Sequence, residues 1–428
     1  MSVHATVLAV GGERRVPAPD PVARDYLLLA LRLDQRLPGL VDGYFGPADL
    51  KAQVDMEQLA APAALVAAAA GLLGRLDGEV DDPARRAWLR VQLAALETHA
   101  RVLAGERPTY LELVRRCFDA EPVRHGEAAF AAVTAELERL VPGPAALRDR
   151  LAGWDARMVV PAERLSGILD WLVGVVRERS VALFGAPDGE SLRVSLVTGQ
   201  PWSAYNWYEG GRRSRVDVNT DLPVRVPDLI GLVTHETYPG HHLEHAWHEA
   251  VRVDQRAELE ASVLLINAPE CLISEGLTEV GRRFAVARGS ETDLVAELLD
   301  RADLGPRSDP VARRALAEQA VRIREARAGL GPAAVDAALM LHVDGLDRAA
   351  VRSWLERVAL MTPELAAKRL EFLEHPLWRT YVFVYSEGAA LLERWLAAVP
   401  ADAAAARFRR LLVEPITPSG IEAELRSG

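Results

Sequence analysis

Histidine is concentrated in one short stretch of this sequence. Five of the ten histidines lie between His235 and His248, in the sequence His-Glu-Thr-Tyr-Pro-Gly-His-His-Leu-Glu-His-Ala-Trp-His. Neutral imidazole is the commonest metal ligand in proteins, and zinc takes nitrogen and oxygen donors where thiolates are lacking. The stretch therefore predicts a metal site holding about one Zn²⁺ per chain, which Mn²⁺ or Co²⁺ could replace.

The adjacent residues His235 and Glu236 match the opening of the H-E-x-x-H motif of zinc hydrolases. In that motif two imidazoles one helical turn apart hold the ion, and the glutamate accepts a proton from the attacking water. The sequence therefore predicts His235 as a metal ligand and Glu236 as the general base.

Pro239 occupies the position of the second histidine of the motif. Proline lacks an amide donor and clashes with the preceding turn, and Gly240 tolerates unusual backbone angles, so we expect a distorted helix here. A bulge that absorbs two residues would bring His241 beside His235. We predict His241 as the second ligand, with His242 as the alternative. The one that does not bind the metal is expected beside the ligands, in support of catalysis.

Two other interpretations stay open. His241, Glu244 and His245 match the inverted motif H-x-x-E-H, which needs no bulge and would also give a zinc hydrolase. The other interpretation is a non-catalytic helical protein that binds a metal. The glutamate next to His235 argues against it, because a structural site needs no general base.

A third ligand is expected from a later helix. Glu275 and Glu279 are four residues apart and share one helix face. One of them could bind the metal while the other orients a ligand histidine, as carboxylates next to metal sites commonly do.

The motif at 235–242 resembles the H-E-x-x-P-G-H-H motif of the DUF885 family, bacterial proteins related to the gluzincin zinc metallopeptidases. Residues 274–276, Ser-Glu-Gly, are similar to the family's downstream E-G-W-A-x-Y element, although Leu277 stands in place of its tryptophan. This resemblance implies that Glu275 is the third ligand.

The resemblance covers roughly residue 192 to the C-terminus, with a weaker match at 42–47, Asp-Gly-Tyr-Phe-Gly-Pro. Residues 385–388, Tyr-Ser-Glu-Gly, are similar to a Tyr-x-x-Gly element of the family. That similarity implies that Tyr385 stabilises the negative charge that develops on the substrate oxygen, and Tyr381 is the second choice.

Gluzincin peptidases bind extended substrate along an edge strand that precedes the zinc helix. The resemblance assigns this role to residues 214–219, because strand addition is a general mode of peptide binding. We therefore predict three substrate-binding residues: Arg215 for a substrate carboxylate, Asn219 at the end of the strand, and Tyr208 in a side-chain pocket.

The surrounding sequence predicts a mainly α fold, gluzincin-like by resemblance, with a small antiparallel sheet next to the active-site helix. Residues 191–198, 203–209 and 214–219 favour strands, and Gly210-Gly211 favours a turn. Asp82, Asp228 and Asp309 are expected helix caps. We divide the chain into an N-terminal helical region (1–190), a catalytic core (191–290) and a C-terminal helical region (291–428).

Composition narrows the function further. The chain has 50 basic and 61 acidic residues, a net charge of −11, which disfavours nucleic-acid and anionic-membrane partners. Neither a signal peptide nor a membrane span is predicted, and two distant cysteines suit a reducing compartment, so we expect a cytoplasmic protein. The predicted function is zinc-dependent hydrolysis of a peptide or small amide.

Overall fold

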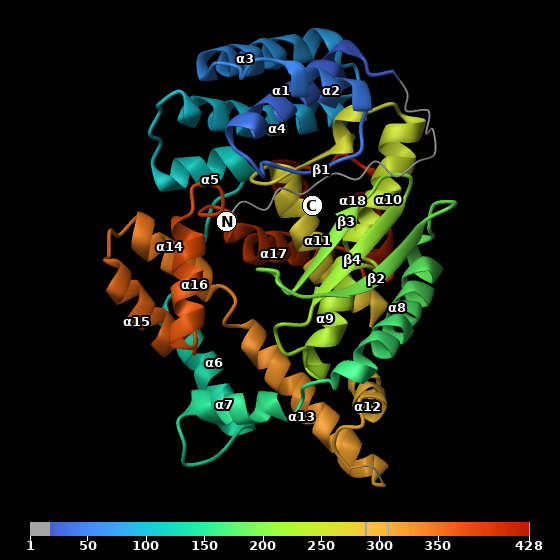
Figure 1. The fold of residues 1–428 in the computed structure, drawn as a ribbon, viewed down its shortest axis with the longest axis vertical. Helices are drawn as coiled ribbons and strands as arrows, with labels where there is room; N and C mark the ends of the chain where they lie inside the picture. The colour runs from blue at the N-terminus through green and yellow to red at the C-terminus, as the bar shows by residue number, and fades with distance from the viewer. Residues whose placement is uncertain (1–17, 287–288, 307, 428) are drawn as a thin grey trace.

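The computed structural model describes residues 18–286, 289–306 and 308–427. The chain is mainly helical with two small sheets, which confirms the predicted fold class (Figure 1). The elements before the histidine-rich motif are α1 (Pro21–Arg36), β1 (Val41–Tyr44), α2 (Ala48–Met56), α3 (Pro62–Glu79), α4 (Pro83–Leu103), α5 (Tyr110–Phe118), α6 (Glu127–Leu140), α7 (Leu147–Ala156), α8 (Ala162–Phe184), β2 (Ser191–Val197), β3 (Ala204–Tyr208) and β4 (Arg213–Asn219).

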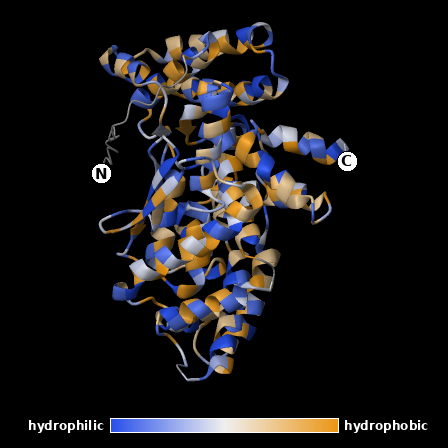
Figure 2. Ribbon diagram, turned by 90° about the vertical axis from the view of Figure 1, so that its right-hand side faces the viewer, coloured by the Kyte–Doolittle hydropathy of each residue, from blue (hydrophilic) through white to orange (hydrophobic). Residues whose placement is uncertain are grey.

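The remaining elements carry the motif and the helices that pack around it. They are α9 (Val226–Glu236), α10 (His241–His248), the π-helix η1 (Glu249–Gln255), the 3₁₀-helix η2 (Leu259–Ser262), β5 (Val263–Leu265), α11 (Pro269–Ala285), α12 (Glu291–Arg301), α13 (Pro310–Ala328), α14 (Ala333–His342), α15 (Arg348–Val358), α16 (Pro363–Glu374), α17 (Phe383–Ala397), α18 (Ala404–Val413) and α19 (Pro418–Ser427). Most helices carry both hydrophobic and hydrophilic residues (Figure 2), as helices with one buried face do. Within the described ranges, every helix is too short or too polar to span a bilayer.

Two of the three predicted helix caps are confirmed. The side chains of Asp82 and Asp309 accept hydrogen bonds from backbone N–H groups in the first turns of α4 and α13. The cap expected at Asp228 is wrong, since α9 begins two residues earlier, at Val226, and Asp228 lies in its first turn. Pro227 explains the difference, because proline suits the first turn of a helix.

The larger sheet has the strand order β2-β4-β3 and is mixed rather than fully antiparallel. β3 and β4 pair antiparallel across the predicted glycine turn, whereas β2 runs parallel to β4. β4 is therefore the central strand, and its two edges are both occupied. The prediction that residues 214–219 form an edge strand open to substrate is wrong.

The motif helix is interrupted between α9, which ends at Glu236, and α10, which begins at His241. A Cβ on Gly240 would lie 1.9 Å from the carbonyl oxygen of His235, so only glycine fits this close approach. The predicted distortion is present, but it is a break between two helices rather than a bulge within one. It places the first residue of α10, His241, beside the last turn of α9.

Helices α11 and α17 cross in direct backbone contact. A Cβ on Gly276 would lie 2.5 Å from the carbonyl carbon of Gly388, and one on Gly388 would lie 2.3 Å from the carbonyl oxygen of Leu272. This crossing sets the separation between the side chains that α11 and α17 contribute to the site.

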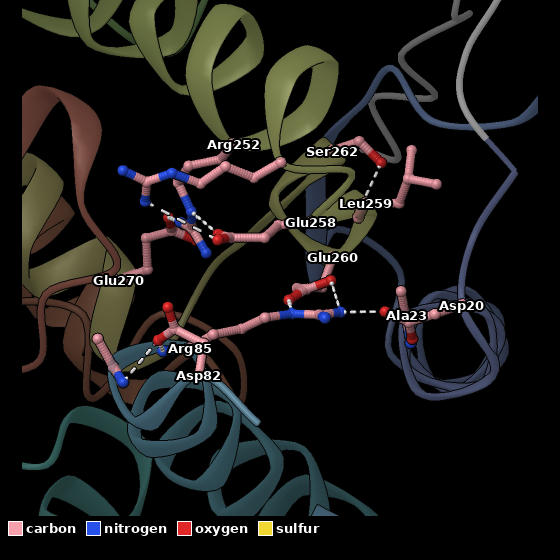
Figure 3. Close-up of polar contacts among 12 residues, drawn as sticks. Asp20, Ala23, Asp82, Arg85, Arg252, Glu258, Leu259, Glu260, Ser262 and Glu270 are labelled. Carbon is pink, nitrogen blue, oxygen red and sulfur yellow. Dashed lines mark hydrogen bonds and ion pairs between the residues drawn. The ribbon is translucent and has the colours of Figure 1, made fainter. Parts of the chain in front are cut away.

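A buried network of ion pairs lies beneath the motif helix (Figure 3). Arg85 of α4 binds both carboxylate oxygens of Glu260, at 2.5 and 2.9 Å, and donates to Asp20 at 2.6 Å. Arg252, which is fully buried, donates to Glu258 at 3.0 Å and to Glu270 at 3.1 Å. The network ties the N-terminal helices to η1, η2 and the start of α11.

We expect Glu260→Gln to destabilise the protein by about 3 kcal/mol, because Arg85 would lose its bidentate partner inside the structure. Asp77→Asn, which removes a mostly exposed partner of Arg90, should change stability by no more than about 1 kcal/mol. Urea unfolding followed by circular dichroism compares the two variants. Equal unfolding midpoints would show that the network does not stabilise the fold.

Candidate functional site

His235, His241 and Glu275 meet at one point between α9, α10 and α11. One ligand atom from each of the three side chains lies within 4.8 Å of the other two. His235 Nε2 lies 3.4 Å from Glu275 Oε2, and His241 Nε2 lies 3.7 Å from Glu275 Oε1. The structure thus brings together the three residues predicted as metal ligands.

The other nitrogen of each imidazole faces a carboxylate. His235 Nδ1 lies 3.5 Å from Glu279 Oε1, and His241 Nδ1 lies 3.5 Å from Glu244 Oε2. The hydroxyl of Ser274 lies 3.2 Å from His241 Nδ1 and donates to Glu244 at 2.6 Å. These contacts orient the two Nε2 atoms toward Glu275, as carboxylates behind metal-binding histidines do.

The electrostatics of this group suit a divalent cation. Burial lowers the pKa of His235, but Glu275 and Glu279 raise it more, so the pKa lies well above its ordinary value. Burial raises the pKa of Glu275, whereas His235 and His241 lower it, and the net shift is downward. Glu275 Oε2 is buried and has no hydrogen-bond partner among the described residues, as expected of an atom that binds a cation.

Glu236 lies beside this group and opens onto the same cavity. It is 9% exposed, and burial raises the pKa of its carboxyl above the ordinary value. Asn206 of β3 donates to the backbone carbonyl of Glu236 at 2.6 Å and so fixes the end of α9 against the sheet. A carboxylate with a raised pKa is suited to accept and return a proton.

The cavity has a volume of about 410 Å³, a size that suits a small ligand or a short peptide end. Besides the residues already described, its wall includes Asp42 of β1, Tyr205 of β3, and Cys271 of α11. The apolar part of the wall consists of Pro201, Trp202, Ala204, Leu264, Leu265, Ile266, Phe372 and Trp378. All three predicted regions of the chain therefore contribute to one site.

The two tyrosines near the start of α17 have different surroundings. Tyr381 is buried and donates to Glu275 Oε1 at 2.6 Å. Tyr385 lines the cavity and is 41% exposed, with its ring 6.5 Å from that of His235. Tyr385 is therefore the tyrosine that is exposed in the cavity, whereas Tyr381 holds Glu275 in place.

The inverted motif is also assembled, since ligand atoms of His241, Glu244 and His245 lie within 4.8 Å of one another. Glu244 would be the general base in that arrangement. Burial raises the pKa of Glu244, but His241 and the neighbouring histidines lower it, to about 2, and Ser274 donates to it. So low a pKa makes Glu244 a poor base and favours the H-E-x-x-P-G-H-H arrangement.

His242 lies outside the cavity, contrary to the prediction of a catalytic role. It is fully buried, with Nδ1 2.8 Å from the hydroxyl of Ser214 and Nε2 2.9 Å from Glu190 Oε2. The break at Gly240 turns His241 toward Glu275. The next residue of α10 consequently faces the sheet.

The three predicted substrate-binding residues also lie elsewhere. Arg215 pairs with Asp217 at 3.1 Å on its own strand, and Asn219 donates to the carbonyls of Gln200 and Trp202 at 2.9 Å. Tyr208 is buried and donates to Glu249. Arg215 and Asn219 stabilise the sheet and its loops instead, because β4 is the central strand, and Tyr208 joins β3 to η1.

Sequence reasoning missed the residues of the cavity that come from distant elements. Edge strand β3 supplies Asn206, which had not been predicted. Asp42 lies on the short strand β1, which pairs with β5 and had not been predicted. The available signal was the similarity of segment 42–47 to the DUF885 family.

No protein-family model and no curated protein matches the chain. A protein from Colwellia psychrerythraea described as a "putative lipoprotein" is 14% identical, with a TM-score of 0.48 over 85% of this chain and 67% of that one. A "putative lipoprotein of unknown function" from Shewanella oneidensis is 10% identical, with a TM-score of 0.44 over 88% and 76%. These similarities concern only part of the backbone fold and say nothing about function.

The two motif arrangements predict that different histidine variants lose the bound metal. We expect His235→Ala to lose the bound metal, about one Zn²⁺ per chain in the unaltered protein, because one of three ligands is removed. His245→Ala, the matched change in the inverted motif, should retain it. Inductively coupled plasma mass spectrometry on both proteins measures this, and the reverse result would assign the site to the inverted motif.

Proposed function

We propose that this protein is a zinc-dependent hydrolase of peptide or small amide bonds, with His235, His241 and Glu275 as the ligands. The observation that carries the proposal is the meeting of these three residues with Glu236 at the wall of one cavity. The resemblance of 235–242 to the DUF885 motif supports the same assignment.

A bound divalent cation supplies Lewis-acid chemistry, making water a stronger acid and polarising the amide carbonyl. Glu236 holds the attacking water and removes its proton as the water adds to the carbonyl carbon. The same carboxyl returns the proton to the leaving nitrogen when the carbon–nitrogen bond breaks, so Glu236 serves as base and then as acid.

Tyr385 donates a hydrogen bond to the former carbonyl oxygen as negative charge develops on it. Its exposure to the cavity supports this role. Tyr381 holds Glu275 in place, so that the ligand carboxylate keeps its orientation. The free thiols of Cys117 and Cys271 support our further proposal of a cytoplasmic location, because reducing compartments keep thiols free.

Replacing Glu236 by Gln tests the general base. The variant should lose turnover by more than about 1000-fold yet keep its metal, because the amide preserves the shape of the side chain but cannot accept the proton. Activity is measured on a library of short peptides with mass-spectrometric detection of products. Full activity with metal bound would overturn the proposed role of Glu236.

Replacing each tyrosine by Phe separates their roles. Tyr385→Phe should lower kcat about 100-fold with metal affinity unchanged, because it removes only a hydrogen bond to the developing charge. Tyr381→Phe should weaken metal affinity about 10-fold, because Glu275 loses its donor. Competition with a chelator gives the affinities, and identical behaviour of the two variants would contradict this division.

A further inference from the structure

The cavity wall is rich in carboxylates and contains no lysine or arginine among the described residues. Its acidic members are Asp42, Glu236, Glu244, Glu270 and Glu275. A divalent cation offsets two of these negative charges, and Arg252 pairs with Glu270 from behind the wall. A substrate carboxylate would therefore meet repulsion from the wall carboxylates and find no lysine or arginine in the described part of the wall.

The unpaired polar atoms of the wall point to a ligand that donates hydrogen bonds. Apart from Glu275 Oε2, which we assign to the cation, buried atoms without a partner in the described structure include Asn206 Oδ1 and His245 Nδ1. The first is an acceptor on edge strand β3. The second is an unpaired ring nitrogen on a side chain that is only 9% exposed and lines the cavity. Buried polar atoms normally have partners. The Asn206 oxygen fits an N–H group of a ligand, and the His245 nitrogen accepts such a group in the tautomer that is protonated at Nε2.

Asp42 is the acidic residue of the wall that has no task in the proposed reaction. Asp42 lies on the short strand β1, at an exposed position of the cavity wall. The hydroxyl of Tyr205, on β3, donates a hydrogen bond to the Asp42 carboxylate. That hydrogen bond holds the carboxylate in place. No described lysine or arginine forms an ion pair with Asp42, so its carboxyl group is available to accept hydrogen bonds from a ligand.

We propose that the cavity recognises the protonated amino end of its substrate and that Asp42 binds this ammonium group. This inference rests on the proposed hydrolase function. It implies that the enzyme cleaves short peptides from their amino end. Charge-assisted hydrogen bonds between ammonium and carboxylate provide the attraction. The wall excludes the carboxyl end, which would lie against like charge.

Paired substrates test this inference on the zinc-loaded full chain. They are p-nitroanilides of alanine, dialanine and trialanine, each with a free and with an acetylated amino end. For whichever peptide length the enzyme cleaves, we expect kcat/KM to be at least about tenfold higher with a free amino end than with an acetylated one. Equal rates, or faster cleavage of the acetylated forms, would overturn the amine site while leaving the hydrolase function in place.

The variant Asp42→Asn should lower kcat/KM for the free substrate about 10- to 100-fold, chiefly through KM, and leave the acetylated substrate unchanged. Asp49→Asn is the matched control, since it removes the same charge from α2 outside the cavity wall and should change neither. Thermal unfolding of both variants checks the fold. If Asp42→Asn fails to fold, the comparison of free and acetylated substrates decides alone.

Binding separates failure of this inference from failure of the proposed function. Zinc-loaded Glu236→Gln protein is titrated calorimetrically with alanyl-alaninamide and with its N-acetyl form. Tighter binding of the free amine supports the amine site even if no anilide is cleaved. Equal binding of the two forms, or binding of neither, would overturn it. Absence of cleavage alone would count against the hydrolase function.

Discussion

Where α11 and α17 cross, two backbones touch with no side chain between them, and the candidate site depends on that contact. Gly276 and Gly388 allow the approach, and a Cβ on either would collide with the backbone of the opposite helix. The crossing brings α17 close enough for Tyr381 to bind Glu275 and for Tyr385 to face the cavity. A wider separation would leave Glu275 without the hydrogen bond from Tyr381 and the cavity without Tyr385.

A second backbone contact shapes the other half of the site. The close approach of Gly240 to the carbonyl of His235 ends one helix and starts another, so that two histidines six residues apart face a single carboxylate. Around these contacts the protein buries Glu244 and Glu275, and each accepts a hydrogen bond from a side chain of another segment. Burial of a carboxylate is costly unless it is paired. The residues that join α9, α10 and α11 are therefore the same ones that we propose as cation ligands.

The local part of the site could be predicted because it is set by spacing along the chain. His235, Glu236 and His241 follow from one motif and one helix break, and Glu275 follows from the resemblance of a nearby segment. The missed parts depend on tertiary arrangement. The order of the strands along the sequence gave no indication that β2 would pair parallel to β4. That pairing makes β4 the central strand. Arg215 and Asn219 consequently lie in the sheet, whereas Asp42 reaches the cavity through the pairing of β1 with β5, more than 200 residues away in the sequence.

The wide spread of the site along the chain also imposes an order on its assembly. During synthesis the amino-terminal part of a chain emerges and folds first, so the residues of β1, β3 and the motif helix are present well before α17. Until α17 docks at Gly276, the cavity lacks Tyr385 and Glu275 lacks its hydrogen-bond donor. A growing chain therefore contains His235, His241 and Glu275 before the cavity is complete, and the cavity is completed only once α17 has been made and packed.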